Sequence, residues 1–167
     1  MDSFVNEIIN IIIVQVQKSP LNRDTDISLF KEDVWKIFRS TEAVFTKEVT
    51  QTFNKIIKTD EFFTKIVVNC IGNITKNTVD GKINVNDTSS ILSMIHEIYE
   101  NVSNLNQQSG FKIPTNMLIC LVGAIIKSIL VFIVHGEDRA PILDLVSMSV
   151  ELVKFSMIKT PGKSLCC

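Results

Sequence analysis

One long apolar stretch constrains the fold of this chain more than any other feature. Residues 117–134 read MLICLVGAIIKSILVFIV, in which Lys127 and Ser128 are the only strongly polar side chains. A helix of this length spans about 27 Å, close to the thickness of a bilayer core. Lys127 lies near its middle, however, where a charge costs on the order of 2.5–3.5 kcal/mol on insertion scales. We therefore expect a central helix buried by the protein's own helices, and a membrane span is the alternative.

The residues that mark this central buried helix are Leu118, Val122, Lys127 and Leu130. At helical spacing, the small and polar residues of the stretch share one face. They are Cys120, Gly123, Ala124, Lys127 and Ser128. This face predicts the close approach of a neighbouring helix, with the Lys127 ammonium reaching a carboxylate or the edge of the domain.

The segment after the central stretch predicts a turn and a second helix. Between His135 and Pro141, Gly136 favours the end of one helix, and Asp138 favours the cap of the next. Pro141 is compatible only with a first helical turn. Residues 142–159 then follow a helical pattern, so residues 115–159 form a predicted antiparallel helical hairpin, the most hydrophobic unit of the chain.

The remaining sequence follows helical periodicity in five further segments. We expect helices at residues 3–18, 28–39, from Ser40 or Thr41 to about 57, from Thr59 or Asp60 to about 76, and from Asp87 to about 103. Polar breaks are predicted at 77–86 and 104–110, and no strand is predicted. The fold class is therefore all-α: a single-domain bundle of about seven helices at residues 1–159 around the buried hydrophobic hairpin. Residues 160–167, in which Pro161 and Gly162 favour a helix end, form a predicted short C-terminal tail.

Composition limits the classes of function. With 167 residues, the chain is the size of one domain, and its net charge of −1 provides no basic field for phosphates, so nucleic-acid binding is not expected. Hydrophobic residues make up 46% of the chain, an ordinary fraction, but its mean hydropathy of +0.26 is high for a lone soluble monomer and indicates apolar surface to be covered by a partner or by lipid. No positively charged segment precedes the apolar start, so we expect the protein to be intracellular or in a virion, not secreted.

Catalytic and metal-binding patterns are not found. His96 and His135 are the only histidines, and neither lies at a metal-ligand spacing or beside a nucleophile motif. Residues 80–87 look like the second half of a calcium-binding loop, but Lys76 would occupy its first ligand position, and a lysine does not bind calcium. We therefore expect no enzyme activity, cofactor, metal or small-molecule substrate.

The four cysteines fall into two groups. Cys70 and Cys120 lie on apolar helix faces and are predicted core residues. Cys166 and Cys167 end the sequence and are candidates for lipidation or for a disulfide, because adjacent terminal thiols resemble a double-prenylation acceptor. Unmodified thiols are the alternative.

The segment from Val79 to Tyr99 carries a resemblance. Its Asp80-Gly81-Lys82-Ile83 turn, acidic cap and Ile-rich helix, in an Asn-, Ile- and Lys-rich helical chain, resemble small structural proteins of large DNA virus particles. That resemblance implies a minor capsid or virion role and no catalytic residue.

Two functional hypotheses follow from these features. The first is a non-enzymatic structural protein that binds other protein subunits and cements a larger assembly, with a viral minor capsid protein as its more specific form. The alternative is a membrane-acting protein that inserts the 115–159 hairpin, like a holin or an apoptosis-regulating helical bundle. Such bundles resemble this chain in having about seven helices around a hydrophobic hairpin. An Asn-Trp-Gly-Arg groove motif is missing, since Trp35 lies in Val34-Trp35-Lys36.

Overall fold

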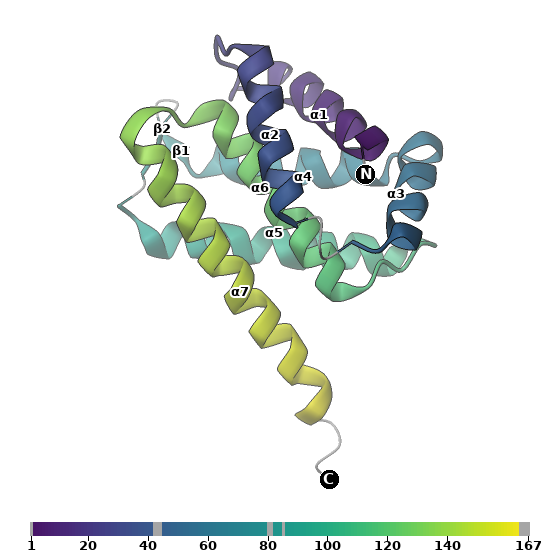
Figure 1. Cartoon of the computed structure of the whole chain (residues 1–167). Helices are drawn as coiled ribbons and strands as arrows, with labels where there is room; N and C mark the ends of the chain where they lie inside the picture. Colours follow the sequence, from purple (N-terminus) through teal and green to yellow (C-terminus); the bar gives the residue numbers. More distant parts are fainter. Residues whose placement is uncertain (1, 42–44, 80–81, 85, 164–167) are drawn as a thin grey trace.

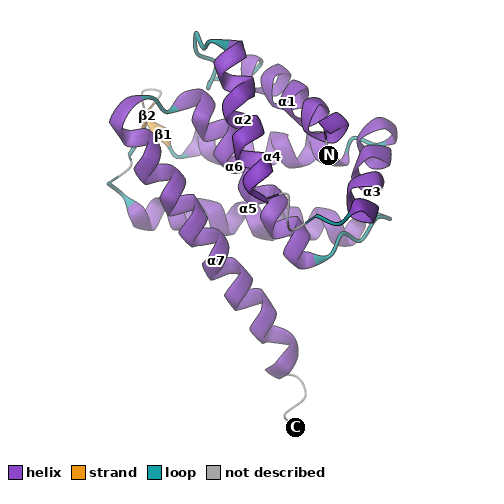
Figure 2. Ribbon diagram, viewed as in Figure 1, coloured by secondary structure: helices purple, strands orange, loops and turns teal. Residues whose placement is uncertain are grey.

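The structure, a computed structural model, describes residues 2–41, 45–79, 82–84 and 86–163. These residues form seven α-helices and one pair of very short strands, which confirms the predicted all-α single-domain bundle (Figures 1 and 2). The helices are α1 (Asp2–Gln17), α2 (Ile27–Thr41), α3 (Lys47–Thr59), α4 (Phe62–Lys76), α5 (Thr88–Gln108), α6 (Thr115–Ile133) and α7 (Arg139–Lys163). The antiparallel strands β1 (Thr78–Val79) and β2 (Lys82–Ile83) pair with Thr78 opposite Ile83. A 3-10 turn, η2 (Gly136–Asp138), joins α6 to α7.

Helix α6 is the centre of the molecule. It packs most extensively against α7 and α2, and also contacts α4, α5 and α1. Leu118, Val122 and Leu130 are buried, and Lys127 is the one half-exposed residue between Leu118 and Phe132. Five neighbours can surround α6 because nearly its whole circumference is apolar.

The turn between α6 and α7 differs in part from prediction, because α6 ends at Ile133 with Val134 as its cap, and Gly136 and Asp138 belong to η2. Gly136 has a φ of +72°, a conformation that glycine adopts without steric cost. Pro141 lies in the first turn of α7, where its missing N–H would have no helical partner. Arg139 Nη2 donates to Asp33 Oδ2 over 2.6 Å, which ties the start of α7 to α2.

The predicted start of α3 is wrong. Ser40 and Thr41 do not cap this helix, because their hydroxyls donate to the Ile37 and Phe38 carbonyls (2.7 and 2.8 Å) and so extend α2. The cap is Thr46, whose side-chain oxygen accepts from the Val49 N–H at 3.3 Å. The sequence offered three hydroxyl residues within seven positions, and local propensity did not distinguish among them.

Two further boundaries differ from prediction. Helix α5 continues to Gln108 through the expected loop, because Asn106 exchanges two hydrogen bonds with the Ile113 backbone (2.8 and 2.9 Å) and fixes the α5–α6 connection. Helix α7 continues to Lys163, four residues into the segment expected as a tail. A proline near a helix end removes a single backbone donor, so the helix can continue past it.

Phenylalanine rings join the N-terminal helices. Phe63 of α4 lies 5.1 Å from Phe4 of α1, 5.5 Å from Phe53 of α3 and 5.4 Å from Phe62, measured between ring centroids. The first two contacts are edge-to-face, an arrangement that aromatic pairs favour. Phe63 is therefore the residue on which three helices converge.

The small-residue face of α6 allows the predicted close approach. A Cβ atom placed on Gly123 would lie 2.7 Å from Val150 Cγ2 of α7 and 3.2 Å from the Tyr99 hydroxyl oxygen of α5. That hydroxyl donates to the Ile119 carbonyl over 2.8 Å within the core. Gly123 is thus a point of close approach between α5, α6 and α7.

Candidate docking surface

Helix α7 carries a row of large apolar side chains that are more than half exposed. Met148, Leu152 and Phe155 are 63%, 58% and 60% exposed. Their spacing of four and three residues places them on one face of the helix. Towards its C-terminal end α7 also extends away from the rest of the bundle (Figure 1). We call these three residues the α7 stripe.

The other face of α7 holds the helix to the core. Ile142, Val146, Val150 and Val153 are buried. We call these four buried residues the anchoring face. Helix α7 is therefore apolar on two faces, the anchoring face and the α7 stripe. A helix with only one buried face normally presents polar residues on the opposite side. The α7 stripe is therefore an exception that calls for a functional explanation.

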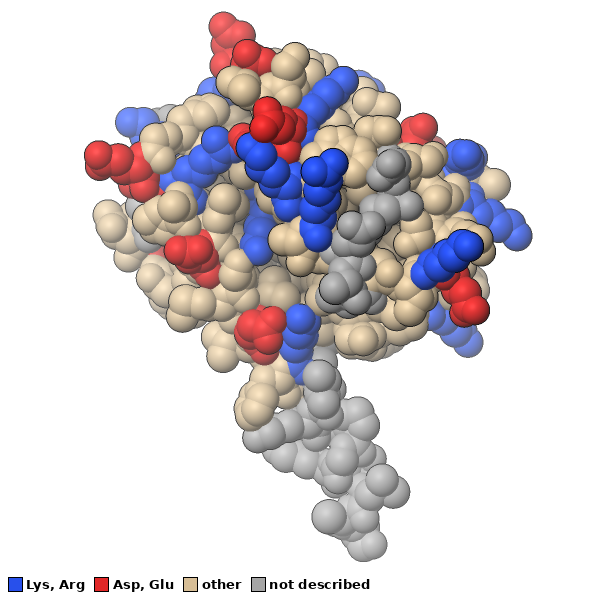
Figure 3. All heavy atoms as spheres, in the orientation of Figure 1, with Lys and Arg blue, Asp and Glu red and all other residues tan. Residues whose placement is uncertain are grey.

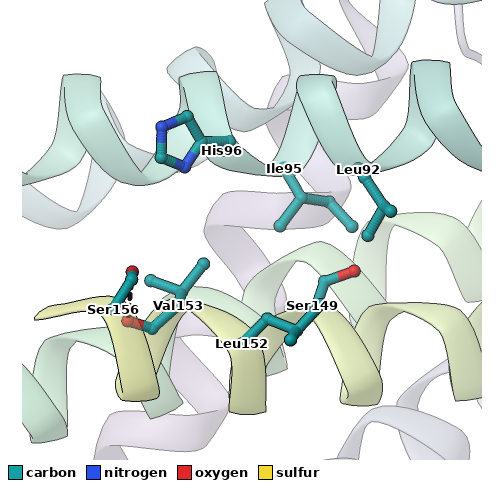
Figure 4. Close-up of a pocket in the computed structure, with 7 residues that line it drawn as sticks. All are labelled: Leu92, Ile95, His96, Ser149, Leu152, Val153 and Ser156. Atoms are coloured by element: carbon teal, nitrogen blue, oxygen red, sulfur yellow. Dashed lines mark hydrogen bonds between the residues drawn. The ribbon is translucent and has the colours of Figure 1, made fainter.

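A groove between α5 and α7 continues the exposed surface. It has a volume of about 290 Å³ and is lined by Leu92, Ile95, His96, Ser149, Leu152, Val153 and Ser156. Figure 4 shows the α5 side chains facing those of α7 across this space. Because Leu152 lines the groove and also belongs to the α7 stripe, the two form one continuous apolar surface.

Both acidic and basic side chains lie around this apolar surface, so the charge around it is not of one sign. Lys154 Nζ lies 3.1 Å from Glu151 Oε1 beside the α7 stripe. On α5, His96 Nε2 lies 3.3 Å from Glu100 Oε1. Figure 3 shows acidic and basic side chains interspersed over the visible face. A mixed polar rim around an apolar centre is the usual composition of a protein–protein interface.

The α7 stripe was not predicted as a site. Leu152 and Phe155 fall within the predicted hydrophobic hairpin of residues 115–159, and the residues predicted to mark the buried helix were Leu118, Val122, Lys127 and Leu130, which form the core and its edge. One signal was present: apolar residues cover more of the 142–159 helix than one buried face requires. Cys166 and Cys167, the candidates for lipidation or a disulfide, lie outside the described residues.

The described residues bear on the predictions for metal ligands and for the core cysteines. Among them, no group of three or more His, Cys, Asp or Glu side chains could hold a metal ion. Cys70 and Cys120 are buried as predicted, and burial raises the pKa of the Cys70 thiol to about 12. A thiol with that pKa is not a nucleophile at neutral pH.

Lys127 lies at the edge of the α6–α7 contact. Partial burial lowers the pKa of its ammonium, and attraction from Asp144 of α7 opposes part of that effect. Asp144 is thus the carboxylate that acts on Lys127, but Lys127 forms no ion pair within 4.0 Å with any described residue. A half-buried cation with an incomplete partner reduces stability at neutral pH.

Lys127→Leu is expected to raise the free energy of unfolding at pH 7 by up to about 1 kcal/mol, a value limited by the solvent exposure of Lys127. The folded-state pKa is lowered, so between that pKa and the ordinary value the unfolded chain binds more protons. Raising the pH through this window therefore stabilises the wild-type protein. The difference in the free energy of unfolding between Lys127→Leu and wild type should thus be smaller at pH 10 than at pH 7. Urea unfolding of both proteins at pH 7 and at pH 10 measures this difference.

Lys55→Leu on the exposed face of α3 is the matched control and should change stability by less than about 0.5 kcal/mol. A Lys127→Leu variant that is less stable than wild type at pH 7, or a gap that is constant with pH, would contradict this account of Lys127.

Comparison with protein-family models, with curated proteins and with solved structures found no match to this chain. The functional argument therefore depends on the sequence and the geometry of the fold.

Proposed function

We propose that this protein is a non-enzymatic structural protein that binds another protein subunit in a larger assembly. The observation that carries the proposal is the α7 stripe, three large apolar side chains each more than half exposed on one helix face. Complete burial of a side chain of this size contributes about 1.5–3 kcal/mol of favourable free energy. A partner that covered the stripe would gain the part of this that belongs to the exposed fraction. The occupant that fits is an apolar helix face, which would lie along the stripe with its side chains in the α5–α7 groove.

A role in a virus particle is the more specific form of this proposal. It follows from the resemblance of residues 79–99 to small structural proteins of large DNA viruses. The Asp80-Gly81 turn that carries part of the resemblance lies outside the described residues. The α7 stripe supports binding to a subunit and is compatible with a minor capsid protein.

Site-specific cross-linking tests the proposal. A photo-reactive amino acid at position 152, introduced into the gene in the cells that naturally express it, should form a cross-link to one defined protein. The same group at position 29 is the matched control, because Leu29 is 60% exposed on α2 but lies outside the stripe. Equal yields at both positions, or no product at position 152, would contradict the proposal.

Helix α6 supports the membrane-acting alternative through its length and apolarity, which make it the one helix among the described residues that could span a bilayer. In the fold, 78% of its most apolar window is buried, as in the core helix of a soluble protein. Insertion of residues 115–159 would require α6 to leave α1, α2, α4 and α5, four of its five neighbouring helices. Flotation with liposomes tests this alternative, and Lys127→Leu should increase the floated fraction if the hairpin inserts.

A further inference from the structure

We propose that the occupant of the α7 stripe is a second copy of this chain, paired through α7 in an antiparallel dimer. This inference rests on the proposed function, because it names the subunit that the stripe binds. The two copies would be related by a two-fold axis perpendicular to α7. This axis would cross the helix pair midway between positions 152 and 153. In such a pair, the same surface of each copy contacts its counterpart.

The position of the stripe on α7 favours an antiparallel pair. Its three side chains are each more than half exposed on the side of α7 away from the anchoring face, so that another helix can lie alongside them. With the helices antiparallel, the two bundles lie towards opposite ends of the pair. Leu152 then lies next to the two-fold axis, and Phe155 of each copy approaches the Met148–Leu152 half of the other stripe.

The charges beside the stripe match this arrangement. Glu151 and Lys154 lie on the same flank of the stripe, 60° and 120° around an ideal helix from its centre by the helical rotation of about 100° per residue. In an antiparallel pair each flank lies beside its own counterpart, so Glu151 of one copy lies at the height of Lys154 of the other, whose side chain is 26% exposed. Two Glu151–Lys154 pairs would therefore form across the interface, in exchange for the intrachain pair at 3.1 Å.

A parallel pair does not reproduce this match. It would bring the Glu151 flank of one copy against the opposite flank of the other, where Ser149 and the α5–α7 groove lie. The same charges also oppose a lipid occupant, because Glu151 has 74% of its side chain exposed and would face an anionic membrane surface.

The expected dimer is weak. A contact made mainly by one helix from each copy lies below the standard interface size, so we expect a dissociation constant on the order of 1–100 µM. Sedimentation velocity of the full chain between about 1 and 500 µM covers this range. The wild-type protein should change from monomer to dimer across it. Leu152→Asp should weaken the dimer by about 100-fold or more, and Leu29→Asp should leave it unchanged.

Charge reversal tests the predicted pairing directly. Glu151→Lys gives a flank with two positive charges, and Lys154→Glu gives one with two negative charges. Each variant alone should dimerise about tenfold more weakly than wild type. An equimolar mixture of the two should recover the dimer, since unlike flanks then face each other. Circular dichroism of each variant establishes that it is folded, and the charge variants keep the test decisive if Leu152→Asp does not fold.

The outcomes separate this inference from the proposed function. A wild-type chain that stays monomeric at all concentrations, or a mixture that recovers no dimer, overturns the antiparallel dimer. If position 152 then still cross-links to a different protein, the proposed function stands without it. Absence of both self-association and cross-linking overturns both proposals.

Discussion

Replacing Phe63 with alanine is expected to lower the free energy of unfolding by about 3–5 kcal/mol. Phe63 is fully buried and contacts the rings of Phe4, Phe53 and Phe62, so the variant loses apolar burial and edge-to-face contacts on three sides. The surrounding rings belong to three different helices and cannot all move into the space. A loss of this size is a large part of the stability of a typical domain. Urea unfolding followed by far-ultraviolet circular dichroism measures it.

Leu29→Ala is the surface control for this experiment. Leu29 is 60% exposed on α2, and alanine has a high helix propensity, so the change should be less than about 1 kcal/mol. A Phe63→Ala variant no less stable than the Leu29→Ala variant would show that the aromatic cluster does not hold α1, α3 and α4 together.

Gly123→Val is expected to lower the free energy of unfolding by about 2–3 kcal/mol. Even a single added carbon would lie 2.7 Å from Val150 Cγ2, and valine adds two further methyl groups beside the Tyr99 hydroxyl. Val150 is β-branched, so its side chain has few alternative rotamers with which to avoid the clash. Helices α6 and α7 would have to separate.

The control and the rescue both follow from the fold. At Gly72 of α4 no atom lies within 4 Å of an added Cβ, so Gly72→Val should change stability by less than about 0.5 kcal/mol. Removing the opposing methyl groups by Val150→Ala should restore part of the stability of Gly123→Val. If the two mutations are instead additive, close packing at Gly123 is not the cause of the loss.

The helices could be predicted because their signals are local. The apolar spacing of residues 3–18 and the break at residues 135–141 need no knowledge of the rest of the chain. The ends of a helix could not be predicted where a distant residue or a competing hydrogen bond determines them. Thr46 rather than Thr41 caps α3, and the bonds between Asn106 and the Ile113 backbone lengthen α5.

The candidate site could not be predicted in the same way. Phe155 and Val153 are both apolar residues of one helix, and periodicity alone does not tell which of them meets a neighbour. Burial of Val153 and exposure of Phe155 depend on where α5 and α6 cross α7.

The sequence by itself determined that this chain folds as a helical bundle around residues 117–134, because a segment so apolar has to be removed from water by the helices around it. Only the tertiary structure decided which apolar residues remain outside. Five helices cover α6, whereas α7 packs against α5 and α6 through its anchoring face, so Met148, Leu152 and Phe155 on its other face remain more than half exposed.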